Sequence, residues 1–294
     1  MSKVLISGGG GQLAQDCERV LQGPSQVLSL SKAQWDIADR DQSRAILERE
    51  RPDFLINCAA YNRVDDCEQE RETADRVNHQ GPKILAELCH SLGIWLVHIS
   101  TDYVFDGKKP VSDFYTEEDE PAPLSVYGKS KRDGELAVMA SMDHFNIIRT
   151  AWLYGMGGEN FVKGMIQKAL KHKSLSVVDD QWGSLTWTGR LAEQIAAILK
   201  QKKPGLYHAT AEGKGTWYQA TKKLMTWLNI SVELSAVRTE EFPRPAPRPK
   251  NSILENRRLK LEGIHLMKPW EDDLREFVLH NKDSLLAGKG RKAS

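Results

Sequence analysis

The feature that most constrains this chain is a regular alternation of short apolar runs with longer amphipathic stretches over its first 150 residues. The apolar runs are too short for helices and rich in β-branched residues, which favours strands. They lie at 4–6, 27–30, 54–58, 94–99 and 145–148. Their uninterrupted hydrophobicity is typical of strands that are covered on both faces, as in a parallel sheet.

The stretches between these runs have the composition and the apolar spacing of helices. They lie at 12–22, 41–50, 66–91 and 124–140. Strands that alternate with helices form βαβ units with right-handed crossovers. The sequence therefore predicts an α/β protein built on a Rossmann-like, doubly wound parallel sheet.

After residue 150 the alternation loosens, and we expect helices at 160–172, 188–201, 216–228 and 270–280, with strands near 175–178 and 205–208. This change predicts two domains. The first, over 1–150, binds a dinucleotide, and segments around 175–200 return to it. The second, over 151–294, is a smaller C-terminal α/β substrate domain.

Two segments of the second half differ from their surroundings. Residues 242–249 hold four prolines and two arginines, so they cannot be helical and predict a stiff, extended loop. Such a loop suits the capture of an anion or serves as a plain spacer. Residues 288–294 have the composition of a frayed tail.

Composition excludes several classes of protein. Of the 294 residues, 41 are Lys or Arg and 40 are Asp or Glu, without the basic excess of a dedicated nucleic-acid binder. No apolar run approaches the roughly 18 residues that a membrane span needs. Four cysteines show no zinc or redox spacing, so we expect reduced thiols. We predict a cytoplasmic protein that binds neither nucleic acid nor membrane.

A glycine cluster follows the first expected strand and precedes the first expected helix. Gly9, Gly11 and Ala14 fit G-x-G-x-x-A, while Gly8, Gly11 and Ala14 fit G-x-x-G-x-x-A. Both patterns direct backbone N–H groups at the helix N-terminus toward a phosphate, and the glycines let it approach closely. We therefore predict dinucleotide binding by Gly8, Gly11, Gln12 and Leu13, with a simple flexible turn as the alternative.

The end of the second expected strand bears on the choice of coenzyme. A carboxylate that binds the ribose 2′-hydroxyl of NAD usually stands there. This chain has Ser31 and Lys32 instead, and no acid before Asp36. Ser31 and Lys32 accept a 2′-phosphate that an acid would repel, which favours NADPH, with NADH as the alternative. Asp36 and Ile37 are expected to flank the adenine.

A tyrosine and a lysine four residues apart carry the chemistry. Tyr127 and Lys131 share one face of an expected helix, so the ammonium can lower the pKa of the phenol and can also hold ribose hydroxyls. Thr101 ends the fourth strand, where catalytic groups of open α/β sheets gather. Its alternative role is to cap a turn. A second match, Tyr218 with Lys222, is interpreted as a solvated helix face.

These motifs resemble an extended short-chain dehydrogenase/reductase and, within that superfamily, the dTDP-4-dehydrorhamnose reductase family. Matching stretches run almost end to end, and the later ones are the more specific. They are 57–61, 64–65, 77–78, 100–105, 123–128, 149–155, 160–163, 180–184, 205–208 and 248–252.

The resemblance implies the reduction of dTDP-6-deoxy-L-lyxo-4-hexulose at C4 to dTDP-L-rhamnose, for surface polysaccharide synthesis. Tyr127 would protonate the carbonyl oxygen, Lys131 would tune Tyr127 and bind ribose, and Thr101 would hydrogen-bond the developing oxyanion. Ala59, Ala60 and Tyr61 would join Tyr127 and Lys131 in binding the cofactor. The implied substrate-binding residues are Thr101, Asp102, Val104, Trp152, Asn160, Lys163, Gln181, Arg248 and Asn251. For Trp152 the alternative is core packing, and for Arg248 it is a salt bridge with a carboxylate.

Some positions depart from the family pattern. The changes at Asn62, Leu185 and Trp187 leave the exact sugar open. Some relatives form a metal-bridged dimer through glutamates, and the matching positions here are Asp16 and Gly189, so we predict no metal site. The chain would then be a monomer or a homodimer.

Two other functions remain open on this scaffold. One is a reductase or epimerase of another deoxysugar nucleotide. The other is a non-catalytic regulatory subunit.

Overall fold

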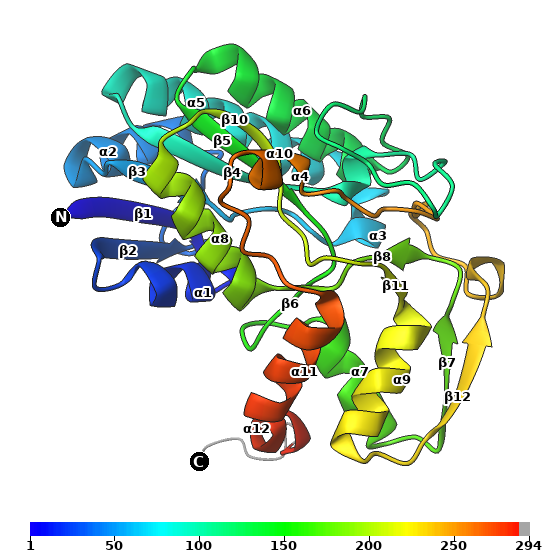
Figure 1. Ribbon diagram of the computed structural model, residues 1–294. Helices are drawn as coiled ribbons and strands as arrows, with labels where there is room; N and C mark the ends of the chain where they lie inside the picture. The colour runs from blue at the N-terminus through cyan, green and yellow to red at the C-terminus, as the bar shows by residue number, and fades with distance from the viewer. Residues whose placement is uncertain (288–294) are drawn as a thin grey trace.

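The computed structural model describes residues 1–287, and the predicted tail at 288–294 lies outside this range. Its centre is a six-stranded parallel sheet with the order β10-β5-β4-β3-β1-β2 (Figure 1). The strands are β1 (Ser2–Gly9), β2 (Ser25–Ser31), β3 (Phe54–Asn57), β4 (Trp95–Thr101), β5 (Phe145–Thr150) and β10 (Gly205–His208). The α/β doubly wound prediction is therefore confirmed.

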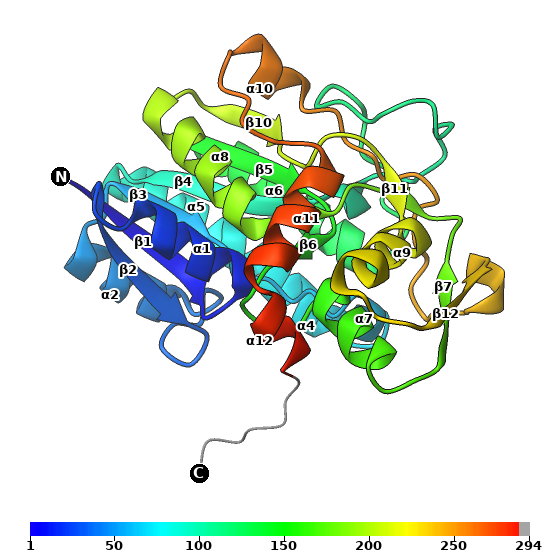
Figure 2. The same cartoon turned by 60° about the horizontal axis from the view of Figure 1, so that its bottom comes forward.

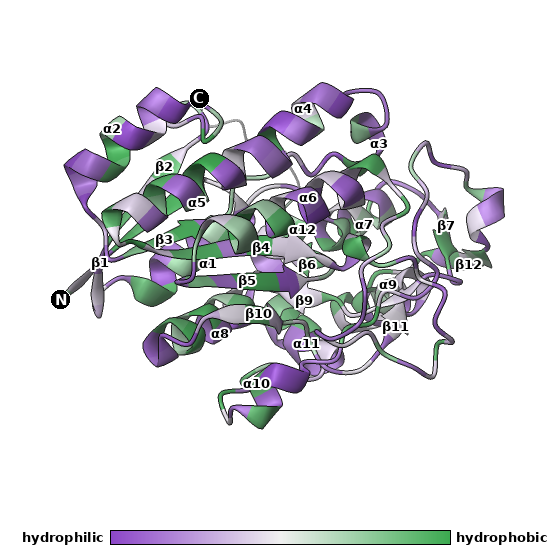
Figure 3. Ribbon diagram, turned by 90° about the horizontal axis from the view of Figure 1, so that it is seen from above, coloured by the Kyte–Doolittle hydropathy of each residue, from purple (hydrophilic) through white to green (hydrophobic). Residues whose placement is uncertain are grey.

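Helices cover both faces of this sheet. One face carries α1 (Gln12–Leu21) and α8 (Thr188–Gln201), while the other carries α2 (Arg40–Glu50), α5 (Gly81–Leu92) and α6 (Val126–Ser141). Figure 3 shows hydrophobic strands between these two helical layers, whose outer surfaces are largely hydrophilic. The burial of both sheet faces explains why the strand sequences are apolar without alternation.

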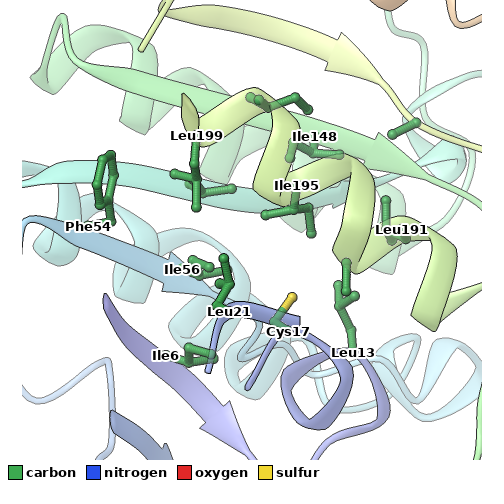
Figure 4. Close-up of a cluster of buried hydrophobic side chains, with 14 of the residues drawn as sticks. Ile6, Leu13, Cys17, Leu21, Phe54, Ile56, Ile148, Leu191, Ile195 and Leu199 are labelled. Atoms are coloured by element: carbon green, nitrogen blue, oxygen red, sulfur yellow. The ribbon is translucent and has the colours of Figure 1, made fainter. Parts of the chain in front are cut away.

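The two hydrophobic cores follow from strand alternation. Val4 and Ile6 pack with α1 and α8, whereas Leu5 between them packs with α2 and α5 on the opposite face. In Figure 4, Leu191, Ile195 and Leu199 of α8 lie over the strands beside the side chains of α1. These contacts bring residues almost two hundred positions apart into a single core.

The C-terminal part forms a third core beside the sheet, visible in Figure 2. Its helices are α7 (Phe161–Ala169), α9 (Trp217–Leu228), α11 (Trp270–His280) and α12 (Lys282–Leu286), and α10 (Arg257–Leu261) packs against β10. Three two-stranded sheets complete it: β6 (Leu153–Tyr154) with β9 (Thr186–Trp187), β7 (Ser174–Val178) with β12 (Glu233–Val237), and β8 (Trp182–Gly183) with β11 (Gly215–Thr216).

The expected helix at 66–91 is wrong as one continuous element. It consists of α3 (Val64–Cys67), α4 (Arg71–Asp75), a π-helical turn η1 (Arg76–Gln80) and α5. Pro82 has no N–H to donate within the helix. The side chain of Asn78 also bonds the backbone of Tyr61 and the hydroxyl of Ser130, so this segment is organised by tertiary contacts.

The range around 175–200 returns to the sheet only in part. Helix α8 covers the sheet, and β10, which follows this range, pairs with β5 at the edge of the sheet. Strand β7 does not return, because it pairs with β12. The elements α10, α12 and β12 were not expected. The proline-rich stretch 242–249 contains no helix or strand, as predicted.

Candidate active site

The glycine-rich turn joins β1 to α1 in the conformation that a phosphate cradle needs. Gly8 has a φ of 77° and Gly10 a φ of 84°, in the left-handed region that favours glycine. A Cβ on Gly8 would lie 2.7 Å from the backbone nitrogen of Ala59. Gly11 is the N-cap of α1 and provides no side chain to cap it, which leaves the first N–H groups of the helix for a ligand.

Two positively charged side chains, Lys32 and Arg76, lie near the end of β2, around the predicted adenosine site. Ser31 donates its hydroxyl to Gln34, and Lys32 is exposed. The sequence analysis missed Arg76, which forms an ion pair with Asp36. Although burial acts against it, hydrogen bonds from Arg76 and from the backbone of Ala38 lower the pKa of Asp36. Arg76 lies in the π-helical turn, 40 residues from Asp36, so no local pattern indicated it.

The other predicted adenosine-side residues divide between core and surface. Ile37 is buried, and its side chain lies so close to Gly81 that a Cβ there would come within 2.8 Å of it. Ala60 lines the central cavity, beside Cys58. Tyr61 donates its hydroxyl to Glu70, and its backbone N–H is held by Asn78.

Thr101, Tyr127 and Lys131 lie in one cavity, as the spacing argument predicted. Thr101 ends β4, and the other two lie on the first turns of α6, whose N-cap Ser125 accepts a hydrogen bond from the N–H of Gly128. The Lys131 ammonium donates to the carbonyl oxygen of Ile99 at 2.6 Å. Thr101 also accepts from the N–H of Tyr103, so it caps a turn as well as lining the cavity.

Burial dominates the electrostatics of this group. It lowers the pKa of Lys131 to about 8, with the Glu135 carboxylate acting in the opposite direction. It raises the pKa of Tyr127 above its ordinary value, against a hydrogen bond with Thr101. In the free protein, burial outweighs the other influences on the pKa of this phenol. The phenol keeps its proton at neutral pH, as a general acid requires.

A buried ionic cluster, absent from the sequence predictions, supports the floor of the cavity. Glu135 is fully buried and accepts hydrogen bonds from Ser100 at 2.6 Å, from Arg149 at 2.8 and 2.7 Å, and from Arg132 at 3.1 Å. These bonds tie α6 to β4 and β5, one residue before Thr101 and Thr150. Glu135 also lies one turn after Lys131.

Asp102 and Val104 follow Thr101, but their environments differ. Asp102 lines the cavity and is only 2% exposed. Burial raises its pKa to about 6, although hydrogen bonds from Ser252 and Thr101 oppose this. Val104 packs with Phe105, Tyr115 and Leu254 in a small hydrophobic cluster and is not among the cavity-lining residues.

The opposite wall of the cavity comes from the C-terminal part. Trp152 has a φ of 47° and stacks on Trp217, which the sequence analysis did not single out. Asn160 is the N-cap of α7, and its side-chain amide donates to the carbonyl of Gly155 and to Gln12. This second bond links the start of α7 to the start of α1, which follows the glycine-rich turn.

Four predicted substrate residues have protein partners of their own and do not line this cavity. Lys163 donates to the carbonyls of Met156 and Gly158 and lines an adjoining cavity of about 480 Å³ with Asn160. Gln181 accepts from the indole N–H of Trp217. Arg248 forms a two-pronged ion pair with Asp65, the alternative considered for it. Asn251 donates to the carbonyls of Lys109, Pro110 and Asp113.

The cavity has a volume of about 380 Å³, within the usual range for small-molecule sites. It joins the glycine-rich turn, the carboxyl end of β4, the start of α6 and the Trp152 wall. A larger cavity of about 740 Å³, lined by Phe54, Leu199 and Lys202 among others, lies at the opposite end of the strands, away from these groups. Within residues 1–287 there is no group of three or more potential metal ligands.

Comparison with known proteins identifies the family. The model of the RmlD substrate binding domain matches residues 2–282. The chain belongs to this family. The spore coat polysaccharide biosynthesis protein SpsK of Bacillus subtilis is 38% identical over 279 residues, which cover 95% of this chain and 97% of SpsK.

Two solved structures of the family have almost the same fold. The dTDP-4-dehydrorhamnose reductase of Clostridium acetobutylicum is 39% identical, with a TM-score of 0.93 over 95% of this chain and 99% of that one. The Bacillus anthracis enzyme of the same name, solved in complex with NADP, is 37% identical, with a TM-score of 0.92 and the same coverage. Among the described residues of our chain, no helix has the length and apolarity that a membrane crossing demands.

Proposed function

We propose that this family member is an NADPH-dependent oxidoreductase that reduces the C4 keto group of dTDP-6-deoxy-L-lyxo-4-hexulose to give dTDP-L-rhamnose. The observation that carries the proposal is the single cavity in which Thr101, Tyr127 and Lys131 meet the glycine-rich turn. The two structural relatives named as this reductase, one of them bound to NADP, support the same reaction.

The residues present fit a dinucleotide. The cradle at Gly8 has no room for a side chain, and α1 directs N–H groups at the same point. Ser31, Lys32 and Arg76 would hold the 2′-phosphate, with Arg76 exchanging its present partner Asp36 for the stronger anion. Gly11, Gln12 and Leu13 line the cavity where the cofactor would enter. When bound, NADPH supplies the hydride for the carbonyl carbon.

The protein supplies the proton and the charge stabilisation. Tyr127 donates the phenolic proton to the carbonyl oxygen as the general acid. The Thr101 hydroxyl donates a hydrogen bond to the same oxygen as negative charge develops on it. The Lys131 ammonium stabilises the phenolate left behind and holds ribose hydroxyls, with the Ile99 carbonyl fixing its direction.

Substrate recognition divides into direct and indirect contacts. Asp102, Trp152 and Asn160 line the cavity and would contact the sugar nucleotide directly. Val104, Gln181 and Asn251 would act through the residues they support. Lys163 and Arg248 can bind diphosphate only by exchanging their present partners. We place the reaction in the cytoplasm, ahead of surface polysaccharide assembly.

The test is NADPH oxidation with enzymatically prepared keto-sugar nucleotide, with the product identified by chromatography and mass spectrometry. We expect dTDP-L-rhamnose in amounts equal to the NADPH consumed, and a slower reaction with NADH. A protein that binds NADPH and leaves this substrate untouched would contradict the proposed substrate. A second deoxysugar ketone would then be the next to assay.

A further inference from the structure

Three aromatic rings form a continuous stack at the substrate side of the cavity. The rings of Trp152 and Trp217 lie 3.6 Å apart between centroids and are inclined by only 12°. Phe161 contacts Trp217 at 4.3 Å with a tilt of 47°. Trp217 is the first residue of α9 and Phe161 is the first of α7, helices that lie side by side in Figure 1. The stack therefore connects two helix N-termini to the loop that follows β5.

Trp152 depends on its neighbours for its orientation. Its φ of 47° is in the left-handed region, which a bulky residue adopts only when its surroundings enforce it. Trp217 covers one face of the indole. Gly183 lies against the fused bond of the same indole, since a Cβ there would come 2.5 Å from Cε2 and 3.0 Å from Cδ2 of Trp152. Both contacts come from the C-terminal part rather than from the strand that precedes Trp152.

Trp217 is itself fixed by a chain of hydrogen bonds. Its indole N–H donates to Oε1 of Gln181 at 3.2 Å, and the Gln181 amide donates to the Thr239 hydroxyl at 3.1 Å. That hydroxyl donates to the Asp180 carboxylate at 2.6 Å. The N-cap Thr216 and Gln219 form a capping box that sets the start of α9. Trp217 is thus held through its indole N–H and through the capping box at the start of α9, although it is only half-buried and lines the cavity.

We propose that Trp217 is a positioning residue that fixes Trp152 as the wall against which the sugar ring of the substrate packs. This inference rests on the proposed function, since it takes the cavity to hold a keto-sugar nucleotide. Sugar rings have apolar C–H surfaces that pack on aromatic faces, and a pre-oriented ring binds them without further ordering. Trp217 and Gly183 hold the indole of Trp152 between them, and the part of the indole that lines the cavity is available to the substrate. Gln181 then acts on the sugar through Trp217, not by direct contact.

The experiment compares Trp217→Ala with Trp227→Ala. Trp227 lies on the same helix and packs against the C-terminal core without lining the cavity, so it is a matched control for the loss of an indole from α9. We expect Trp217→Ala to raise KM for the keto-sugar nucleotide about tenfold or more with a much smaller change in kcat. Affinity for NADPH should stay near wild type. Trp227→Ala should leave both kinetic constants unchanged, and Trp217→Phe should recover part of the loss.

Product binding separates the sugar from the nucleotide. By calorimetry, Trp217→Ala should bind dTDP as the wild type does and should bind dTDP-L-rhamnose more weakly. Equal weakening for dTDP and dTDP-L-rhamnose would overturn the assignment to the sugar ring. An unchanged KM in a folded Trp217→Ala protein would overturn the positioning role. Gly183→Ala is the second variant, because it displaces Trp152 from the opposite side and should raise the same KM.

A ligand-free measurement distinguishes failure of this inference from failure of the proposed function. Lack of turnover by the wild type would refute the proposed function alone. A double-mutant cycle of Trp152→Ala and Trp217→Ala, followed by urea unfolding, then still tests whether the two rings fix each other. We expect strongly non-additive losses of stability. Additive losses would show that Trp217 does not hold Trp152.

Discussion

The substitution Glu135→Gln tests the buried ionic cluster beside the proposed catalytic residues. The Glu135 carboxylate accepts four hydrogen bonds, two of them from Arg149, and both side chains are almost completely buried. Glutamine has one acceptor oxygen, so its NH₂ group would face a guanidinium donor. Arg149 cannot lose its proton and would keep an uncompensated charge. Removing one partner of a buried ion pair costs about 3–5 kcal/mol.

The assay is urea unfolding of Glu135→Gln beside Glu48→Gln at neutral pH. Glu48 pairs with Arg44 on the surface of α2 at 3.6 Å, with both side chains about half exposed. The same chemical change there should cost less than about 0.5 kcal/mol. We expect the urea concentration at the unfolding midpoint to be far lower for Glu135→Gln than for the control. The difference should correspond to a loss of about 3–5 kcal/mol in the free energy of unfolding. A loss below about 1 kcal/mol would refute the reasoning on buried pairs.

The substitution Glu135→Gln should also change the pH dependence of activity. The Glu135 carboxylate raises the pKa of Lys131, against burial that lowers it to about 8. In the proposed mechanism Lys131 acts in its charged form, so turnover should fall as pH rises through about 8 in the wild type. Without the carboxylate the pKa of Lys131 falls further, and this decline should begin at lower pH. An alkaline limb at the same pH in both proteins would contradict the role of Lys131.

Three further substitutions test the site, and a fourth serves as a control. Tyr127→Phe removes the proton donor and should lower kcat by about 10²–10⁴-fold while NADPH affinity, measured by fluorescence, stays near wild type. Asp102→Asn should stabilise the protein at pH 7 by up to about 3 kcal/mol, because burial raises the pKa of Asp102 from 3.8 to about 6. The folded carboxyl therefore takes up a proton below about pH 6, whereas the unfolded one takes it up only below about pH 4. The stability that the wild type loses by burying the charged carboxylate should therefore grow as pH rises from about 4 to about 6, as measured by urea unfolding against Asp102→Asn. Gly128→Ala would place a Cβ 2.2 Å from the Tyr103 carbonyl oxygen, so thermal unfolding should show a loss of about 1–3 kcal/mol. Gly164→Ala, which meets no atom within 4 Å on α7, should instead gain up to about 1 kcal/mol.

Local patterns predicted the elements of the sheet and the proximity of Thr101, Tyr127 and Lys131 well. Apolar runs gave the strands because both faces of the sheet are covered, and the predicted strand at 205–208 coincides with β10. Tyr127 and Lys131 share a helix, so their proximity needed only the helical period. Thr101 joined them through the rule that strands of a parallel sheet end at one edge.

Tertiary contacts decided what the sequence left open. Arg248 reaches Asp65, 183 residues away, and therefore ends in a salt bridge that no spacing indicates. In the sequence Trp217 cannot be told from an ordinary core residue. Its role follows from its stacking on Trp152, and this stacking depends on how α9 meets the loop after β5. The pKa of Tyr127 depends on the depth of the cavity around it, which a four-residue motif does not encode.

The central claim is that the cavity around Tyr127 reduces a keto-sugar nucleotide. The most direct measurement is the oxidation of NADPH by the wild-type protein with dTDP-6-deoxy-L-lyxo-4-hexulose, beside Tyr127→Phe. We predict stoichiometric formation of dTDP-L-rhamnose by the wild type and almost none by the variant. Equal turnover by both proteins would contradict the assignment of Tyr127 as the acid, and no turnover by a wild type that binds NADPH would contradict the substrate.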